Sequence, residues 1–270
     1  MNLWGLPPQT LIRELAANTV MGVPAVRRNR LKGLRTRAPS PQFEARKIDA
    51  QFDFLRDSTG DIEGKVVVEI GPGDALGLAP LFIAAGAARY VAVDRFLGDV
   101  WGSDANGLYQ EIERLRGPFP GGWREQVTLV RHSIEQNVAG VPPADIILSF
   151  DVIEHLLDLT HAVRNMSSLL KPDGRMIHRI DYGPHGVWLS TDDPLSFLAV
   201  PDWLWTAIGS NRGYPNRIRH RQFVQLLEDQ GLRVAERITR RQGTDVMDAE
   251  LACAFQAAPQ LGRPFAQEPA

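Results

Sequence analysis

Val66-Val-Val-Glu-Ile-Gly-Pro-Gly-Asp-Ala-Leu-Gly77 is the stretch that decides the fold. Its valines and isoleucine predict a strand covered on both faces of a sheet, because β-branched side chains suit a buried strand. Gly71 and Gly73 predict a sharp turn at which the backbone can approach a ligand, since glycine has no Cβ. We therefore expect a buried strand, then a glycine turn, then a helix.

A second apolar strand, Tyr90-Val-Ala-Val-Asp94, ends in an acid. Asp94 lies 21 residues beyond Gly73. At this spacing, a strand-end acid in a nucleotide-binding βαβ unit can hydrogen-bond a ribose. The pattern indicates a cofactor that contains adenosine.

The glycine pattern departs from the one that dinucleotides require, because its third glycine falls one residue late, at Gly77. Glu69 precedes the first glycine by two residues and places a carboxylate near the ligand. That carboxylate would repel a pyrophosphate but suits a cationic group. S-adenosylmethionine has an ammonium group, a sulfonium group and no phosphate, so both departures favour it.

Glu69-Ile-Gly-Pro-Gly73, with Asp94, resembles the first motif and the ribose acid of the class I S-adenosylmethionine-dependent methyltransferases. The resemblance continues through Asp145-Ile-Ile-Leu-Ser-Phe-Asp-Val-Ile-Glu-His155 and Leu169-Leu-Lys-Pro-Asp-Gly174, and covers roughly residues 60–181. It implies an α/β, Rossmann-like fold with a seven-stranded, mostly parallel sheet, helices on both faces and an antiparallel last strand. The alternative is a Rossmann-like domain without a cofactor.

The resemblance also implies a set of cofactor-binding residues, in which two residues after the third strand contact the adenine. That adenine pair is His132 and Ser133. The full set is Glu69, Gly71, Pro72, Gly73, Asp94, Arg95, His132, Ser133 and Phe150.

Composition is ordinary for a soluble globular protein, with 44% hydrophobic and 23% charged residues in a chain of 270. The net charge of −2 gives no overall attraction to nucleic acid, which is therefore not the expected partner. The lone Cys253 cannot form an internal disulfide, and Arg13 and Glu14 interrupt the apolar N-terminal run, so neither a secreted nor a membrane protein is predicted. We expect a cytoplasmic protein and leave a homodimer open.

The chain divides into an N-terminal helical extension over residues 1–60, a methyltransferase domain over 61–258 and a flexible tail over 259–270. A short helix is expected from Leu11. A second is expected over 43–56, and in related enzymes such a helix closes over the cofactor. Further helices are predicted over 75–88 and 221–230. Strands are predicted over residues 66–70, 90–94, 127–130, 145–150, 175–181, 233–240 and 249–257.

An insertion over residues 182–220 follows the fifth strand and is longer than a usual connection. Its aromatic residues could form a platform for the acceptor or a small satellite core. These residues are Trp188, Phe197, Trp203, Trp205 and Tyr214. Two basic segments, 27–37 and 216–221, could bind an anionic group or could be solvated.

Asp151, Glu154 and His155 follow the fourth strand directly. At positions i, i+3 and i+4 of a helix they would share one face, and two carboxylates with an imidazole suit Mg²⁺ or Mn²⁺. The segment resembles the metal-binding segment of ubiquinone-pathway O-methyltransferases and small-RNA 2′-O-methyltransferases, which usually have glutamate where this chain has Asp151. The alternative is a helix start like that of metal-free methyltransferases.

The fifth strand ends in His178-Arg-Ile-Asp-Tyr-Gly-Pro-His185, which is dense in ionisable groups. Either histidine could be a general base or complete a metal shell. Strand alternation places His178 and Ile180 on one face and Arg179 and Asp181 on the other. The predicted catalytic residues are His155, His178 and Asp151, and the predicted metal ligands are Asp151, Glu154, His155 and His178.

These observations predict a methyltransferase that methylates a hydroxyl of a saccharide or another polar small molecule, assisted by Mg²⁺. One rival is a metal-free N- or C-methyltransferase of a small metabolite with a histidine base. Another is a protein that binds S-adenosylmethionine without turnover. The basic run over residues 27–37 motivates a third rival, a nucleic-acid methyltransferase.

Overall fold

The computed structural model describes residues 7–26, 40–73, 75–97, 100–101, 107–184, 195–242 and 245–255. At its centre is a seven-stranded sheet with the strand order β3-β2-β1-β4-β5-β7-β6. The strands are β1 (Val66–Ile70), β2 (Arg89–Val93), β3 (Val127–Val130), β4 (Ala144–Phe150), β5 (Leu170–Asp181), β6 (Leu232–Gln242) and β7 (Asp245–Phe255). Strands β1 to β5 run parallel, and β7 is antiparallel to β5 and β6. The predicted Rossmann-like fold is confirmed, including its antiparallel last strand.

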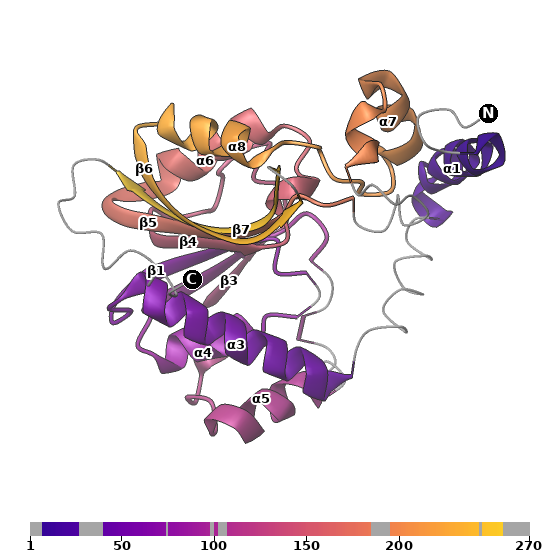
Figure 1. Cartoon of the computed structure of the whole chain (residues 1–270). Helices are drawn as coiled ribbons and strands as arrows, with labels where there is room; N and C mark the ends of the chain where they lie inside the picture. Colours follow the sequence, from indigo (N-terminus) through magenta and orange to yellow (C-terminus); the bar gives the residue numbers. More distant parts are fainter. Residues whose placement is uncertain are drawn as a thin grey trace.

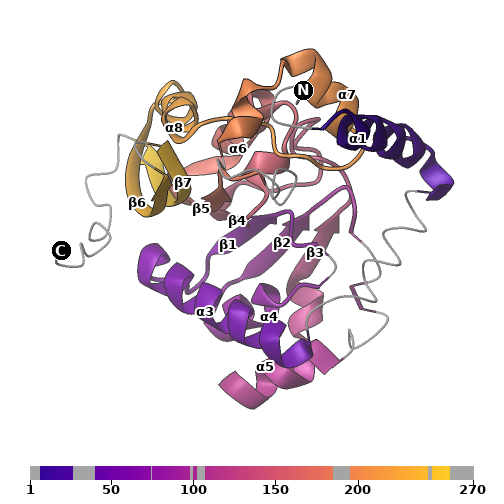
Figure 2. The ribbon, with the colours of Figure 1, turned by 45° about the vertical axis from the view of Figure 1, so that its right-hand side comes forward.

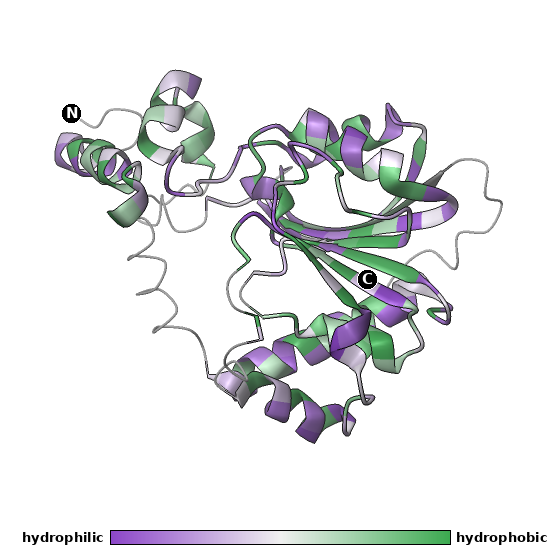
Figure 3. Ribbon diagram, turned by 180° about the vertical axis from the view of Figure 1, so that it is seen from behind, coloured by the Kyte–Doolittle hydropathy of each residue, from purple (hydrophilic) through white to green (hydrophobic). Residues whose placement is uncertain are grey.

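Helices cover both faces of this sheet (Figures 1 and 2). One face packs against α3 (Pro41–Thr59), α4 (Leu78–Ala84) and α5 (Leu108–Arg116), and the other against α6 (Leu159–Leu169) and α8 (His220–Glu228). Strand β1 shows why the sheet is central, because Val67 faces the first helical layer and Val68 the second, and neither is exposed. Figure 3 shows the hydrophobic strands between the two mixed helical layers.

Helix α3 begins and ends as its sequence dictates. The Ser40 side chain accepts a hydrogen bond from the Phe43 N–H at 3.3 Å, and proline occupies the first helical position. The helix ends at Gly60, whose φ of 72° lies in the left-handed region. The predicted helix over residues 43–56 is confirmed, and it packs on the sheet through Ile48, Phe52 and Leu55.

A separate group of elements lies beside the sheet (Figure 1). It consists of α1 (Pro8–Met21) and residues 195–214, which include η4 (Ser196–Ala199) and α7 (Asp202–Gly209); we call it the side lobe. Phe197 and Trp205 are buried in its apolar centre and Tyr214 packs against them. The satellite-core interpretation therefore holds for these three aromatic residues.

The other two aromatic residues of the insertion differ from them. Trp203 is 66% exposed and is not part of the buried centre of the side lobe. Trp188 lies outside the described residues.

Polar contacts attach α1 to the insertion instead of to the sheet. The Tyr214 hydroxyl donates to Glu14 Oε2 at 2.5 Å, and Arg212 forms an ion pair with the same carboxylate. Burial raises the pKa of Glu14, but the hydrogen bonds from Tyr214 and Arg212 outweigh burial, so the net shift is downward. Asn18 Nδ2 donates to the Ala207 carbonyl at 2.9 Å. The N-terminal extension thus divides, with α1 joining the insertion and α3 the sheet.

Two predicted helices differ from the structure. The first helix of the fold is shorter than the predicted 75–88, because α4 spans only Leu78–Ala84. The predicted helix at Asp151 is wrong, since that segment forms only a 3-10 turn, η3 (Ile153–His155). The basic run at 27–37, His185 and the tail at 259–270 lie outside the described residues. Within the described ranges, no helix has both the length and the apolar character needed to cross a membrane.

Candidate active site

A pocket opens at the carboxyl edge of the parallel strands, where ligands bind in such sheets. Its walls come from the segments that follow β1, β2, β3 and β4, and we call it the donor pocket. The lining residues are Ile70, Gly71, Val93, Asp94, Arg95, Phe96, His132, Ser133, Ile134, Glu135, Asp151, Val152, His155 and Leu156. The structure thus gathers seven of the predicted site residues in one place: Gly71, Asp94, Arg95, His132, Ser133, Asp151 and His155.

The two glycines after β1 have different reasons to be glycine. Both have a positive φ, of 71° at Gly71 and 75° at Gly73. A Cβ on Gly71 would lie 2.5 Å from a methyl carbon of Val152, so this glycine lets the loop after β4 pack on the turn. A Cβ on Gly73 would have no described heavy atom within 4 Å. The turn therefore leaves open space at Gly73, and a ligand can approach the backbone there.

Asp94 is held at the end of β2 by backbone N–H groups. Its Oδ2 accepts from the Gly73 N–H at 3.3 Å, and its Oδ1 accepts from the Phe96 N–H at 2.6 Å. The first bond ties the acid directly to the glycine turn. Beside it, the Arg95 guanidinium lies 4.6 Å from the centre of the exposed Phe96 ring.

Glu69 is not among the residues that line the donor pocket. It is only 7% exposed, and its Oε2 accepts a 2.5 Å hydrogen bond from the fully buried Tyr90 hydroxyl. Burial is the main reason that the pKa of Glu69 is raised to about 7, and the nearby Asp94 charge adds to the rise. Pro72, Gly73 and Phe150, which are also predicted cofactor residues, are likewise not among the lining residues.

The two predicted adenine residues both line the pocket but are already hydrogen-bonded. The Ser133 hydroxyl donates to Glu135 Oε2 at 2.7 Å, and His132 Nε2 lies 2.8 Å from the Ala139 carbonyl oxygen. Glu135 also accepts from the N–H groups of Leu157 and Asp158. This carboxylate therefore joins the loop after β3 to the loop after β4, and the sequence reasoning missed it.

Asp151 ends β4 in a strained backbone conformation. Its φ of 56° is one of two positive values for non-glycine residues in the described part of the chain. An N–H bond to the Arg179 carbonyl at 3.0 Å holds it there, and the Arg179 Nε donates to Asp151 Oδ1 at 3.0 Å. Strain of this kind costs about 1–3 kcal/mol and concentrates at functional sites. Asp151 is thus a fixed wall of the donor pocket.

A family model described as a methyltransferase domain matches residues 42–237 of this chain. The chain belongs to the methyltransferase domain family. Its sheet order and its glycine turn agree with the S-adenosylmethionine-dependent methyltransferase that the motifs predict. No curated protein matches the chain.

Several solved structures are similar to this methyltransferase at low identity. One, from Listeria monocytogenes and described as an S-adenosylmethionine-dependent methyltransferase, has a TM-score of 0.51 and 14% identity over 76% of this chain and 97% of its own. Another such methyltransferase, from Mesorhizobium loti, has a TM-score of 0.49 and 14% identity over 76% and 99%. Magnesium protoporphyrin IX methyltransferase from Synechocystis, solved with bound S-adenosylhomocysteine, has a TM-score of 0.49 and 16% identity over 78% and 83%.

The methyltransferase positions His155 through an asparagine of the insertion. His155 is half-buried in η3 and lines the donor pocket. Asn216 Nδ2 donates to the Ile153 and Leu156 carbonyls, both at 2.9 Å, and its N–H donates to the Glu154 carbonyl at 2.6 Å. Three hydrogen bonds from one residue therefore clamp the turn that presents His155, which no sequence motif indicated.

The predicted metal ligands do not fit a metal in this methyltransferase. Asp151 is paired with Arg179, and Glu154 is 1% exposed, with a pKa raised to about 8 by burial and then by the charges of Asp151 and Asp181. A carboxyl with that pKa keeps its proton at pH 7 and is a poor ligand. Among the described residues, no three His, Cys, Asp or Glu side chains lie close enough together to hold an ion.

His178 does not reach the donor pocket either. It shares a buried face with Ile180, as alternation predicts, and has no exposed surface. Its Nδ1 lies 2.8 Å from the Ser149 hydroxyl and its ring packs on Phe223. Burial lowers the pKa of His178 to about 4. The prediction of His178 as base or metal ligand is corrected, because it lies within the core beneath α8.

Proposed function

We propose that this methyltransferase methylates a hydroxyl oxygen of a saccharide or another polar small molecule, with His155 as the general base. The observation that supports this most is the donor pocket itself, in which the only described histidines are His132 and His155. His132 has carbonyl oxygens within 3.2 Å of both ring nitrogens. His155 lies on the wall after β4, which Asp151 also lines. An alcohol is a weak nucleophile and needs a base to take its proton.

The residues of the pocket fit S-adenosylmethionine, which supplies an electrophilic methyl carbon bound to a cationic sulfur. Gly73 offers backbone next to open space, and the anchored carboxylate of Asp94 suits the ribose hydroxyls. We assign Gly71, Gly73 and Asp94 to this cofactor. Glu69 adds negative charge behind the turn only when it is ionised, because burial raises its pKa to about 7.

The chain contributes orientation and proton transfer to the reaction. In-line displacement requires the acceptor oxygen and the methyl carbon to be close and aligned, and the Asp151–Arg179 pair keeps the wall after β4 in one position. As the new O–CH₃ bond forms and the S–CH₃ bond breaks, the hydroxyl proton passes to the imidazole of His155. The Asn216 clamp holds the turn that carries His155.

A panel of sugars, phenols and amines incubated with methyl-labelled donor tests this function. We expect label on a hydroxylated acceptor, and a loss of about 10²–10⁴-fold in turnover for His155→Gln, the usual contribution of a general base. The matched control is His161→Gln, since His161 is an exposed histidine of α6 that pairs with Asp158 outside the pocket. Label on an amine or a carbon acceptor, or full turnover by His155→Gln, would contradict the proposal.

A further inference from the structure

Helix α1 lies at the edge of the molecule, beside α7 and away from the sheet (Figures 1 and 2). One side of it is fixed to the insertion, where Glu14 accepts from the Tyr214 hydroxyl and Asn18 donates to the Ala207 carbonyl. Glu14 and Asn18 are buried on that side. These contacts determine which side of α1 faces away from the rest of the protein.

The side of α1 that faces away is apolar. Ile12, Ala16 and Val20 follow one another at intervals of four residues, so they lie on one face of the helix, and all three are exposed. Ile12 is 67% exposed and Val20 is 52% exposed. Directly after the helix, Val23 and Val26 are 49% and 37% exposed. We call these five residues the outer strip. A helix that packs on one side normally has polar residues on the other, so the outer strip indicates a contact surface.

The polar groups beside the outer strip are already occupied. The Thr19 hydroxyl donates to the Leu15 carbonyl at 2.9 Å, and Arg13 forms an ion pair with Glu14 at 3.0 Å. Arg13 and Glu14 are the only charged residues of the segment from 8 to 26. A partner therefore meets the outer strip through burial of apolar side chains.

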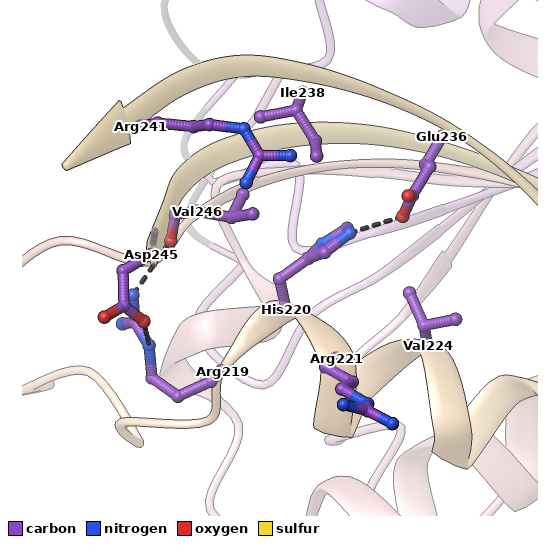
Figure 4. Close-up of a pocket in the computed structure, with 9 residues that line it drawn as sticks. All are labelled: Arg219, His220, Arg221, Val224, Glu236, Ile238, Arg241, Asp245 and Val246. Carbon is purple, nitrogen blue, oxygen red and sulfur yellow. Dashed lines mark hydrogen bonds and ion pairs between the residues drawn. The ribbon is translucent and has the colours of Figure 1, made fainter. Parts of the chain in front are cut away.

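The outer strip contrasts with the cavity between α8 and the hairpin of β6 and β7, which is rich in charge (Figure 4). Arg221 and Arg241 lie on opposite walls of that cavity, and the Arg219 Nε lies 3.4 Å from Asp245 Oδ1 (Figure 4). Covering such groups with hydrocarbon costs their hydration. The outer strip has no ionisable side chain, so covering it carries no such cost.

The sequence that follows the outer strip is strongly basic. Residues 27–37 contain six positive charges and no acid. Arg27 and Arg28 come directly after Val26. Because consecutive Cα atoms are about 3.8 Å apart, the Cα atoms of both arginines lie within about 8 Å of that of Val26, which is about the Debye length at physiological ionic strength. A partner that covers the outer strip therefore also meets positive charge, which favours an anionic surface.

We propose that the outer strip binds the surface of an anionic lipid bilayer. Peripheral proteins are held there by two signals together, apolar side chains that enter the headgroup region and basic residues beside them. Nucleic acid fits the outer strip less well, because its affinity comes from phosphate contacts and base stacking, and the segment from 8 to 26 has one basic residue and no aromatic one. Binding of this kind needs no membrane-spanning helix. It does not depend on the identity of the acceptor.

Sedimentation of the full-length protein with lipid vesicles tests the proposal. We expect binding to vesicles of phosphatidylcholine and phosphatidylglycerol in equal parts, and binding about tenfold weaker or less to phosphatidylcholine alone. Ile12→Ser/Val20→Ser should bind the anionic vesicles at least about tenfold more weakly, because two apolar side chains no longer enter the bilayer. The matched control, Phe43→Ser/Leu115→Ser, removes exposed apolar side chains from α3 and α5 and should bind as the wild type does.

Titration with S-adenosylhomocysteine checks the fold of the double variant. Ile12 and Val20 are exposed and lie outside the donor pocket, so the affinity for this nucleoside should not change. The proposal fails if the wild type does not sediment with anionic vesicles, or if Ile12→Ser/Val20→Ser binds them as tightly. In the first case, light scattering and titration with a single-stranded RNA show whether the outer strip serves a second copy of the chain or a nucleic acid instead.

Discussion

The donor pocket and the side lobe are built in opposite ways. In the donor pocket, backbone groups at strand ends make the decisive contacts, such as the bond from Gly73 to Asp94 across 21 residues. In the side lobe, side chains join α1 to the insertion, as in the bond from Tyr214 to Glu14 across 200 residues. The donor pocket therefore depends more on local sequence, and the side lobe more on long-range polar pairs.

One junction links these halves. Asn216 leaves the insertion and clamps η3, whose His155 lines the donor pocket, and Glu154 of the same turn accepts from the Asp181 N–H at 3.3 Å at the end of β5. The wall of the donor pocket after β2 is therefore built from contacts close in sequence, and the wall after β4 from long-range contacts.

The largest effect is expected from Gly71→Ala. Alanine at a φ of 71° costs about 1–2 kcal/mol, and contact with Val152 at 2.5 Å adds about 1–3 kcal/mol of overpacking, so the free energy of unfolding in urea should fall by about 2–5 kcal/mol. The alanine side chain in Gly73→Ala meets open space, so this variant should lose only the free energy of unfolding that the positive φ costs. In the double variant Gly71→Ala/Val152→Ala, the stability that overpacking against Val152 removes should be recovered. Equal losses at both glycines would show that packing of the turn is irrelevant.

The next effect is the pH dependence that Glu154 introduces. Its pKa is raised from 4.5 to about 8 on folding, so the unfolded chain loses this proton first and stability falls as pH rises from about 4.5 to 8. Glu154→Gln should therefore be more stable than the wild type at pH 8, by up to about 3 kcal/mol, and equal to it at pH 4. Denaturation in urea at both pH values measures this. Glu228→Gln, a substitution at an exposed position of α8, should show no such difference. A stability difference between Glu154→Gln and the wild type at pH 4 would refute the raised pKa of Glu154.

Asp94→Asn tests the local half by ligand affinity. Loss of the charge at the ribose position should weaken S-adenosylhomocysteine binding about tenfold to a hundredfold, which corresponds to about 1.4–2.7 kcal/mol. Asp173→Asn is the matched control because Asp173 is exposed outside the pocket. Calorimetry that finds wild-type affinity for Asp94→Asn would remove Asp94 from the cofactor site.

The smallest effect is expected from Asn216→Ala. Loss of the clamp on η3 should lower kcat/KM about three- to tenfold, while S-adenosylhomocysteine affinity stays within twofold, because the nucleoside side of the pocket does not depend on Asn216. Gln225→Ala removes an exposed amide from α8 and should leave both quantities unchanged. An affinity loss as large as the loss of kcat/KM would show that the two halves are not separable.

The segment after β4 shows where prediction from sequence stopped. The sequence predicts the strand itself, because residues 146–148 are consecutive large apolar side chains. The helix expected after it does not form, since Arg179 of β5 holds Asp151 at a positive φ and Asn216 of the insertion clamps the following turn. Neither partner is adjacent in sequence, so spacing alone could not reveal that Asp151 and His155 line the donor pocket while Glu154 is buried.

The sequence by itself determined the sheet, the glycine turn and the acid at the end of β2, because β-branched runs, glycine backbone freedom and strand-end spacing act over short stretches of chain. Only the tertiary structure decided the rest. It buried His178 and Glu154, joined α1 to the insertion, and placed Arg221 opposite Arg241. Burial and ion pairing depend on which segments meet after folding, and these set the charge and exposure of each side chain.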